Sequence, residues 1–146
     1  MSVEQVSPEE AKRLLEENEC VYLDVRTVPE FTYGHPRGAL NIPFYEMDAA
    51  TGRMALNKRF LAIVEMHISK KLRIIVGCQA GPRSDDAAGQ MTQAGYRHVR
   101  SMTGGFGGIT DGSGRVLQEG WSTLGYPIER GDGGPRGYQS LSAGQR

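Results

Sequence analysis

Four short, predominantly apolar runs stand out along the chain before residue 103. Residues 20–25 (CVYLDV) and 72–77 (LRIIVG) contain few polar interruptions, which is typical of strands buried on both faces of a parallel sheet. Residues 39–42 form a shorter run that ends at Pro43, and residues 98–102 form another. The pattern therefore predicts four strands in this part of the chain.

Segments with helical spacing separate these runs. Within 57–69, apolar side chains recur every three or four positions, which predicts a helix. One further helix is predicted after Ser7, where Pro8 suits the first helical position and Glu10 completes a capping box with Ser7. Two more are predicted over 27–31, with Thr27 as the cap, and over 84–94 before Gly95. Strands that alternate with helices predict an α/β fold with a parallel sheet.

The composition changes after Thr103, where thirteen of the twenty glycines lie. Residues 104–119 are expected to form a long irregular loop with a hairpin turn at 111–114, and residues 121–128 are expected to return to the core. We assign 1–130 to one domain and 131–146 to a flexible, glycine-rich tail. Within that tail, Tyr138 and Leu141 are three positions apart. One helical turn would place both on one face, ready to dock in an apolar groove of the same or a neighbouring subunit.

Length and charge narrow the range of partners. The chain has 146 residues, which suits one domain, and its formal net charge is zero, so no overall field attracts nucleic acid or an anionic membrane. No apolar run approaches the ~20 residues that a membrane-spanning helix needs. The acidic, amphipathic first residues do not resemble a signal peptide, and a cytoplasmic location is expected. Cys20 and Cys78 form no metal-binding motif, so neither a metal nor another cofactor is predicted.

The segment that follows the run 72–77 carries the most specific chemistry. It consists of Cys78, Gln79, Ala80, Gly81, Pro82, Arg83 and Ser84, and it leads into a predicted helix. Backbone N–H groups of such a loop, together with the helix dipole, favour a thiolate and the anion that it attacks. Gly81 allows a tight curl and Pro82 limits flexibility. Arg83 is expected to bind a donor oxyanion, and Ser84 is expected to cap the helix or contact the sulfur.

Two other interpretations of Cys78 compete with a reactive thiolate. A cysteine at a strand end is often only a small buried core residue. A cysteine-dependent phosphatase or arsenate reductase also uses a cradle loop, but with five residues between Cys and Arg, whereas four separate Cys78 from Arg83. The smaller ring suits a sulfur atom better than a tetrahedral phosphate. Asp24 and Arg26 are expected to form a buried ion pair that supports the loop.

Several short motifs together resemble those of single-domain rhodaneses, which are sulfurtransferases. They are LDVR (23–26), EF (30–31), GHPRGALNIP (34–43), VGCQAGPRS (76–84), AA (87–88), GY (95–96), GG (104–105) and W-STLG-Y-P (121–127). The resemblance implies a five-stranded parallel sheet with helices on both faces. It also implies that Cys78 carries a persulfide and that 79–84 form its cradle. The usual pattern has a Trp soon after the Gly-Gly pair, whereas this chain has Phe106 and reaches Trp121 only later.

These observations predict an enzyme that moves sulfane sulfur from an anionic donor such as thiosulfate to cyanide or a thiol through a Cys78 persulfide. Two alternatives remain open, namely a non-catalytic persulfide carrier and a redox-sensing module, each docked to a partner protein. The expected partners are the small-molecule donor and acceptor, with a thioredoxin-like or sulfur-carrier protein as a further candidate. Neither nucleic acid nor membrane is expected as a partner.

Overall fold

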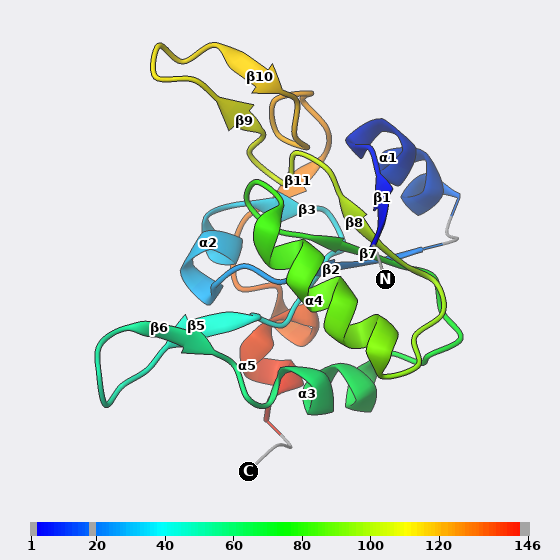
Figure 1. Ribbon diagram of the computed structural model, residues 1–146, viewed down its shortest axis with the longest axis vertical. Coiled ribbons are helices and arrows are strands. Elements are labelled where there is room, and N and C mark those ends of the chain that lie inside the picture. Colours follow the sequence, from blue (N-terminus) through cyan, green and yellow to red (C-terminus); the bar gives the residue numbers. More distant parts are fainter. Residues whose placement is uncertain (1–2, 18–19, 144–146) are drawn as a thin grey trace.

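In a computed structural model that describes residues 3–17 and 20–143, five parallel strands form the central sheet (Figure 1). Their spatial order is β1 (Glu4–Val6), β8 (Val99–Met102), β7 (Ile74–Gly77), β2 (Val21–Asp24) and β4 (Leu40–Asn41). Strands β7 and β2 are central and have almost no exposed residues, as expected for a sheet that is covered on both faces. The predicted parallel α/β fold is confirmed.

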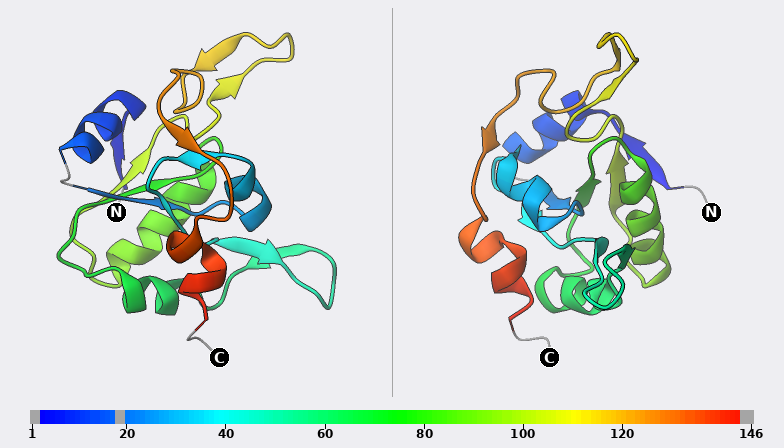
Figure 2. Two further views of the ribbon diagram at one scale, coloured as in Figure 1. Left: turned by 180° about the vertical axis from the view of Figure 1, so that it is seen from behind. Right: turned by 90° about the vertical axis from the view of Figure 1, so that its left-hand side faces the viewer.

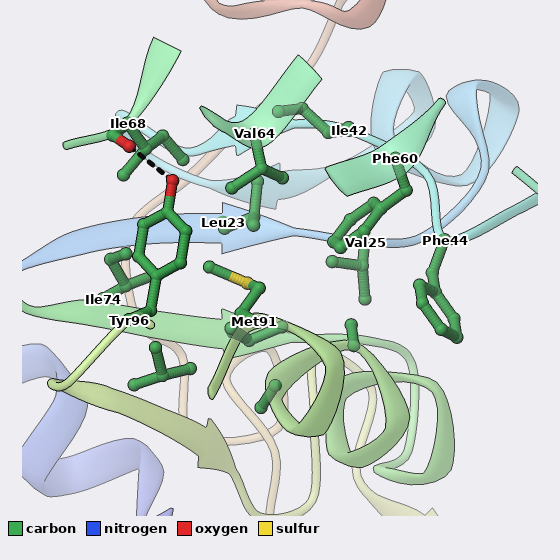
Figure 3. Packing of buried hydrophobic residues seen from close by; sticks show 14 of the residues in the cluster. Leu23, Val25, Ile42, Phe44, Phe60, Val64, Ile68, Ile74, Met91 and Tyr96 are labelled. Atoms are coloured by element: carbon green, nitrogen blue, oxygen red, sulfur yellow. Dashed lines mark hydrogen bonds between the residues drawn. The ribbon is translucent and has the colours of Figure 1, made fainter. Parts of the chain in front are cut away.

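Helices cover both faces of this sheet. The helices α3 (Phe60–His67) and α4 (Pro82–Gln93) pack on one face, and their apolar side chains join those of the strands in the larger core cluster (Figure 3). In this cluster the Tyr96 hydroxyl donates a hydrogen bond to the Ile68 carbonyl. The helices α1 (Pro8–Glu16) and α2 (Val28–Tyr33) pack on the other face, where a second cluster includes Trp121. Residues 121–128 therefore do return to the core, as predicted.

The sequence pattern missed strand β1, the fifth strand of the sheet. It has only three residues, two of which are exposed, so it offers no apolar run to recognise. Its pairing with β8 places Gln5 opposite Ser101 at the edge of the sheet. The strand count implied by the family resemblance is therefore correct, and the pattern-based count was one strand short.

In the described part of the chain, three antiparallel strand pairs lie outside the main sheet. Strand β3 (His35–Pro36) pairs with β11 (Ile128–Glu129), and β5 (Tyr45–Met47) pairs with β6 (Met54–Leu56). Strands β9 (Ile109–Thr110) and β10 (Val116–Gln118) form a projecting hairpin, visible at the top of both views in Figure 2. The turn predicted at 111–114 connects its strands, although the pattern alone did not predict the strands themselves.

Residues 131–143, for which the composition predicts a flexible tail, contain regular structure. They form a 3-10 helix, η1 (Gly134–Arg136), and the short helix α5 (Tyr138–Leu141), which lies beside α3 in Figure 2. Leu141 is only 6% exposed and belongs to the larger core cluster, against which Tyr138 also packs. The two side chains therefore pack on the core of their own chain, as one of the two docking alternatives predicted. The prediction for 144–146 lies outside the described residues.

Within the described ranges, no helix is both long enough and apolar enough to cross a membrane.

Candidate active site

Cys78 lies directly after β7, at the carboxyl edge of the sheet, and is 1% exposed. The backbone N–H of Gly81 donates a hydrogen bond to its sulfur over 2.9 Å. Gly81 makes this possible because its φ of 144° lies in a region that other residues rarely adopt. Gly81 is also the N-cap of α4, so Pro82 and Arg83 form the first turn of the helix. The curled loop that the sequence predicted is therefore present, with an N–H group directed at the sulfur.

Ser84 links the sulfur to the sheet. Its Oγ lies 3.5 Å from the Cys78 sulfur and 2.7 Å from Oγ of Ser101 on β8. It also donates a hydrogen bond to the Gly81 carbonyl over 2.7 Å. Of the two roles considered for Ser84, contact with the sulfur is the one found, because Gly81 provides the helix cap.

A glycine-rich segment, 104–108, lies against the cysteine loop. The N–H groups of Phe106 and Gly107 donate hydrogen bonds to the carbonyls of Cys78 and Gln79, over 2.7 and 3.0 Å. Gly105 permits this approach, since a Cβ atom there would lie 2.5 Å from the Cys78 carbonyl oxygen, and its φ is +60°. The first residues of the predicted irregular loop are therefore hydrogen-bonded to the cysteine loop and belong to the site.

A buried ion pair supports the loop on its other side. The Arg26 guanidinium binds both carboxylate oxygens of Asp24, with a shortest distance of 2.7 Å, and both side chains are almost fully buried. Arg26 also donates to the Gln79 side-chain oxygen over 3.2 Å and lies over the Phe106 ring, 4.4 Å from its centroid. The predicted ion pair is confirmed, and it connects the end of β2 to the cysteine loop.

Arg83 is placed differently from the expectation that it faces a donor oxyanion. Its two Nη atoms bind the two carboxylate oxygens of Glu30 on α2, over 2.8 and 3.1 Å. Burial alone would raise the pKa of Glu30, but hydrogen bonds from Arg83 and Thr27 outweigh it and hold this pKa at about 2. The hydrogen bond to Glu30 likewise raises the pKa of Arg83. Arg83 therefore ties the start of α4 to α2, although the two helices cover opposite faces of the sheet.

An open, mainly apolar pocket of about 450 Å³ adjoins this ion pair. Its apolar walls are Pro29, Tyr33 and Phe106, and Glu30 and Gln79 also line it. The pocket therefore lies between α2 and the Gln79 side of the cysteine loop. It provides an apolar surface beside the cysteine loop, and Arg26 also lines it.

Two further residues, His35 of the GHPRGALNIP motif and Cys20, lie outside the cysteine loop. His35 is buried, stacks on Phe31 with ring centroids 3.6 Å apart, and its Nδ1 lies 2.7 Å from the Phe31 carbonyl oxygen. Cys20 is half-buried and packs against the second core cluster, whereas Cys78 belongs to the first. Throughout the residues described, no cluster of three His, Cys, Asp or Glu side chains is arranged to hold a metal ion.

With this geometry established, comparison with known proteins becomes informative. The sequence model described as "Rhodanese-like domain" matches residues 7–111. The chain belongs to the rhodanese-like domain family. The crystal structure of Rv0390 from M. tuberculosis is similar to this rhodanese-like domain with a TM-score of 0.74 and 27% identity, over 90% of this chain and all of that one.

Curated relatives of this rhodanese-like domain include two proteins from Arabidopsis thaliana. "Thiosulfate sulfurtransferase 16, chloroplastic" is 42% identical over 85 residues, which is 58% of this chain and 69% of that protein. "Thiosulfate sulfurtransferase 18" is 41% identical over 106 residues, which is 71% of this chain and 76% of that protein. The chain spans slightly under half the length of two further plant relatives.

Sequence reasoning missed two members of this rhodanese-like site, Glu30 and Ser101. Glu30 was noted only as part of the EF motif, and Ser101 only as part of a strand. A charged residue three positions after a helix cap is the available signal for Glu30, since it marks the first turn of α2. No comparable sequence signal singles out Ser101, which contacts Ser84 only because β8 lies next to β7.

Proposed function

We propose that this protein is a sulfurtransferase in which Cys78 accepts a sulfane sulfur atom as a persulfide and passes it to a nucleophilic acceptor. The observation that carries the proposal is the position of the Cys78 sulfur, within 2.9 Å of the Gly81 N–H at the start of α4. An N–H donor and a helix N-terminus stabilise negative charge on the sulfur without acting as a competing base. The family assignment and the names of the relatives support the same activity.

The reaction consists of two displacements at sulfur. In the first, the Cys78 thiolate attacks the outer sulfur of a donor such as thiosulfate. The S–S bond of the donor breaks, and its electron pair leaves with sulfite. In the second, cyanide or a thiolate attacks the terminal sulfur of the persulfide, and the Cys78 thiolate is released again. The Gly81 N–H is positioned to stabilise the anionic sulfur in both steps.

The Arg83 contacts argue against the phosphatase alternative. A loop that binds phosphate needs an arginine whose guanidinium group donates hydrogen bonds to the bound oxyanion. Here both Nη atoms of the Arg83 guanidinium donate hydrogen bonds to Glu30 on α2. The loop also has one residue fewer between Cys78 and Arg83 than such a cradle uses.

Steady-state kinetics test the proposal. With thiosulfate and cyanide as substrates, we expect thiocyanate to form and double-reciprocal plots to be parallel, as a covalent two-step mechanism requires. The Cys78→Ser variant should be inactive while remaining folded. A matched Cys20→Ser variant should retain turnover, because Cys20 lies outside the loop. Thiocyanate formation by Cys78→Ser at the wild-type rate would refute the proposal.

A further inference from the structure

Arg83 in the cysteine loop and Arg26, which contacts Gln79 of that loop, are both paired with carboxylates. Arg26 is bound by Asp24 at 2.7 Å, and Arg83 is bound through both Nη atoms by Glu30. Along 78–84, Arg83 is the only positively charged side chain. The formal charge of these four side chains is therefore zero, and the positive character of the loop comes from its N–H groups and the dipole of α4. Such a site gives a dianion little more attraction than a monoanion.

Glu30 is held in place independently of Arg83. Its Oε1 accepts hydrogen bonds from the Thr27 backbone N–H at 3.1 Å and from the Thr27 hydroxyl at 3.0 Å. The Glu30 backbone N–H donates in return to the Thr27 hydroxyl, which completes a capping box at the start of α2. The carboxylate is thus a fixed negative charge, and an entering anion must compete with it for Arg83.

The apolar pocket begins at the same residue. Glu30 lines it together with Pro29, Tyr33 and Phe106, so the residue that pairs with Arg83 also borders an apolar surface. Tyr33 is 80% exposed and is available to cover part of a bound molecule. A volume of about 450 Å³ is much larger than thiosulfate needs and is sufficient for an aromatic or short aliphatic group.

We propose that Glu30 determines the donor class of this sulfurtransferase. It favours organic monoanionic sulfane donors over dianionic thiosulfate. The apolar group of such a donor occupies the pocket that Tyr33 and Phe106 line. The inference rests on the proposed function, since it concerns the first of the two displacements. An organic thiosulfonate is a donor of this class. The Cys78 thiolate attacks its outer sulfur, the S–S bond breaks, and the electron pair leaves with a sulfinate. Charge is conserved, because a thiolate and a thiosulfonate become a persulfide anion and a sulfinate.

The test compares kcat/KM for benzenethiosulfonate and for thiosulfate, with cyanide as the common acceptor. The wild type should use benzenethiosulfonate more efficiently. In Glu30→Gln, the amide oxygen preserves the cap to Thr27 while Arg83 becomes an uncompensated charge. Thiosulfate kcat/KM should then rise about fivefold to tenfold and depend more steeply on salt, whereas benzenethiosulfonate should change less than about twofold.

Three control variants separate this effect from others. Glu9→Gln makes the same charge change on an exposed part of α1 and should leave the donor ratio unchanged. Adding Arg83→Ala to Glu30→Gln should abolish the gain with thiosulfate, because Arg83 supplies the freed charge. Tyr33→Ala should lower the ratio of kcat/KM for benzenethiosulfonate to kcat/KM for thiosulfate roughly threefold or more, because it removes apolar contact area from the pocket.

Two results would overturn the inference alone. One is a wild type that prefers thiosulfate, and the other is a Glu30→Gln variant that loses activity equally with both donors, which would make the ion pair purely structural. If neither donor forms a persulfide on wild-type Cys78, the proposed function fails as well. Persulfide formation with an unchanged donor ratio therefore distinguishes failure of this inference from failure of the proposed function.

Discussion

Leu141 allows the packing of the C-terminal segment to be tested quantitatively. Its side chain is 6% exposed within the larger core cluster, and its carbonyl oxygen lies 2.6 Å from Nε2 of His67. Leu141→Ala removes three carbons, which at about 0.8 kcal/mol each gives about 2.4 kcal/mol of lost transfer free energy. A residual cavity adds to this, so we expect the free energy of unfolding to fall by about 3 kcal/mol. For a chain of this length, Tm should fall by roughly 10 °C.

Urea unfolding monitored by circular dichroism, together with calorimetry, measures this loss. Leu117→Ala is the matched control, because Leu117 is 58% exposed on the β9–β10 hairpin and should change stability by less than about 0.5 kcal/mol. If Leu141→Ala costs no more than Leu117→Ala, residues 138–141 contribute nothing to the core. The composition-based prediction of a flexible tail would then be right after all.

Three further predictions concern the cysteine loop and its supports. Gly105→Ala should destabilise the fold by about 2 kcal/mol or more and slow persulfide formation, because its Cβ would lie 2.5 Å from the Cys78 carbonyl oxygen at a φ of +60°. A variant that unfolds at the same urea concentration as the wild type would contradict this. Asp24→Asn should cost about 3 to 5 kcal/mol, since it leaves the buried Arg26 charge without its partner, and calorimetry that finds a loss below 1 kcal/mol would count against the ion pair. The depressed pKa of Glu30, about 2 against an ordinary 4.5, means that its stabilisation is complete above pH 4.5 and is lost as the pH falls toward 2. The stability difference between wild type and Glu30→Gln, roughly 1 to 2 kcal/mol after allowance for solvent screening, should therefore disappear over that interval, and a constant difference between pH 6 and pH 2 would refute the assignment.

Local signals in the sequence predicted those parts of the fold that depend on neighbouring residues. Ser7 and Thr27 cap the helices that they were expected to cap, and the apolar runs form strands. One local detail of α1 differs. The Ser7 hydroxyl accepts from the Glu10 N–H as predicted, but the Glu10 carboxylate binds Arg13 and the capping box is incomplete. Competition with a side chain one turn later explains that difference.

Contacts between distant positions could not be predicted in the same way. Glu30 and Arg83 are 53 residues apart on helices that cover opposite faces of the sheet, and only the tertiary fold brings their side chains together. The abundance of glycine in 131–146 suggested disorder, although Tyr138 and Leu141 supply enough apolar contact to hold α5 on the core. The glycines of 104–108 likewise suggested an irregular loop. Their small size instead allows the segment to approach the Cys78 loop closely and to form backbone hydrogen bonds with it.

The central claim is that Cys78 carries the transferred sulfur, and intact-mass spectrometry of the reduced protein after incubation with a sulfane donor tests it most directly. We predict a gain equal to one sulfur atom, located on Cys78 by peptide mapping and lost when cyanide is added. The Cys78→Ser variant, which keeps the Cys20 thiol, should show no gain. An adduct on Cys20 in place of Cys78, or an unmodified wild-type protein at saturating donor, would contradict the account.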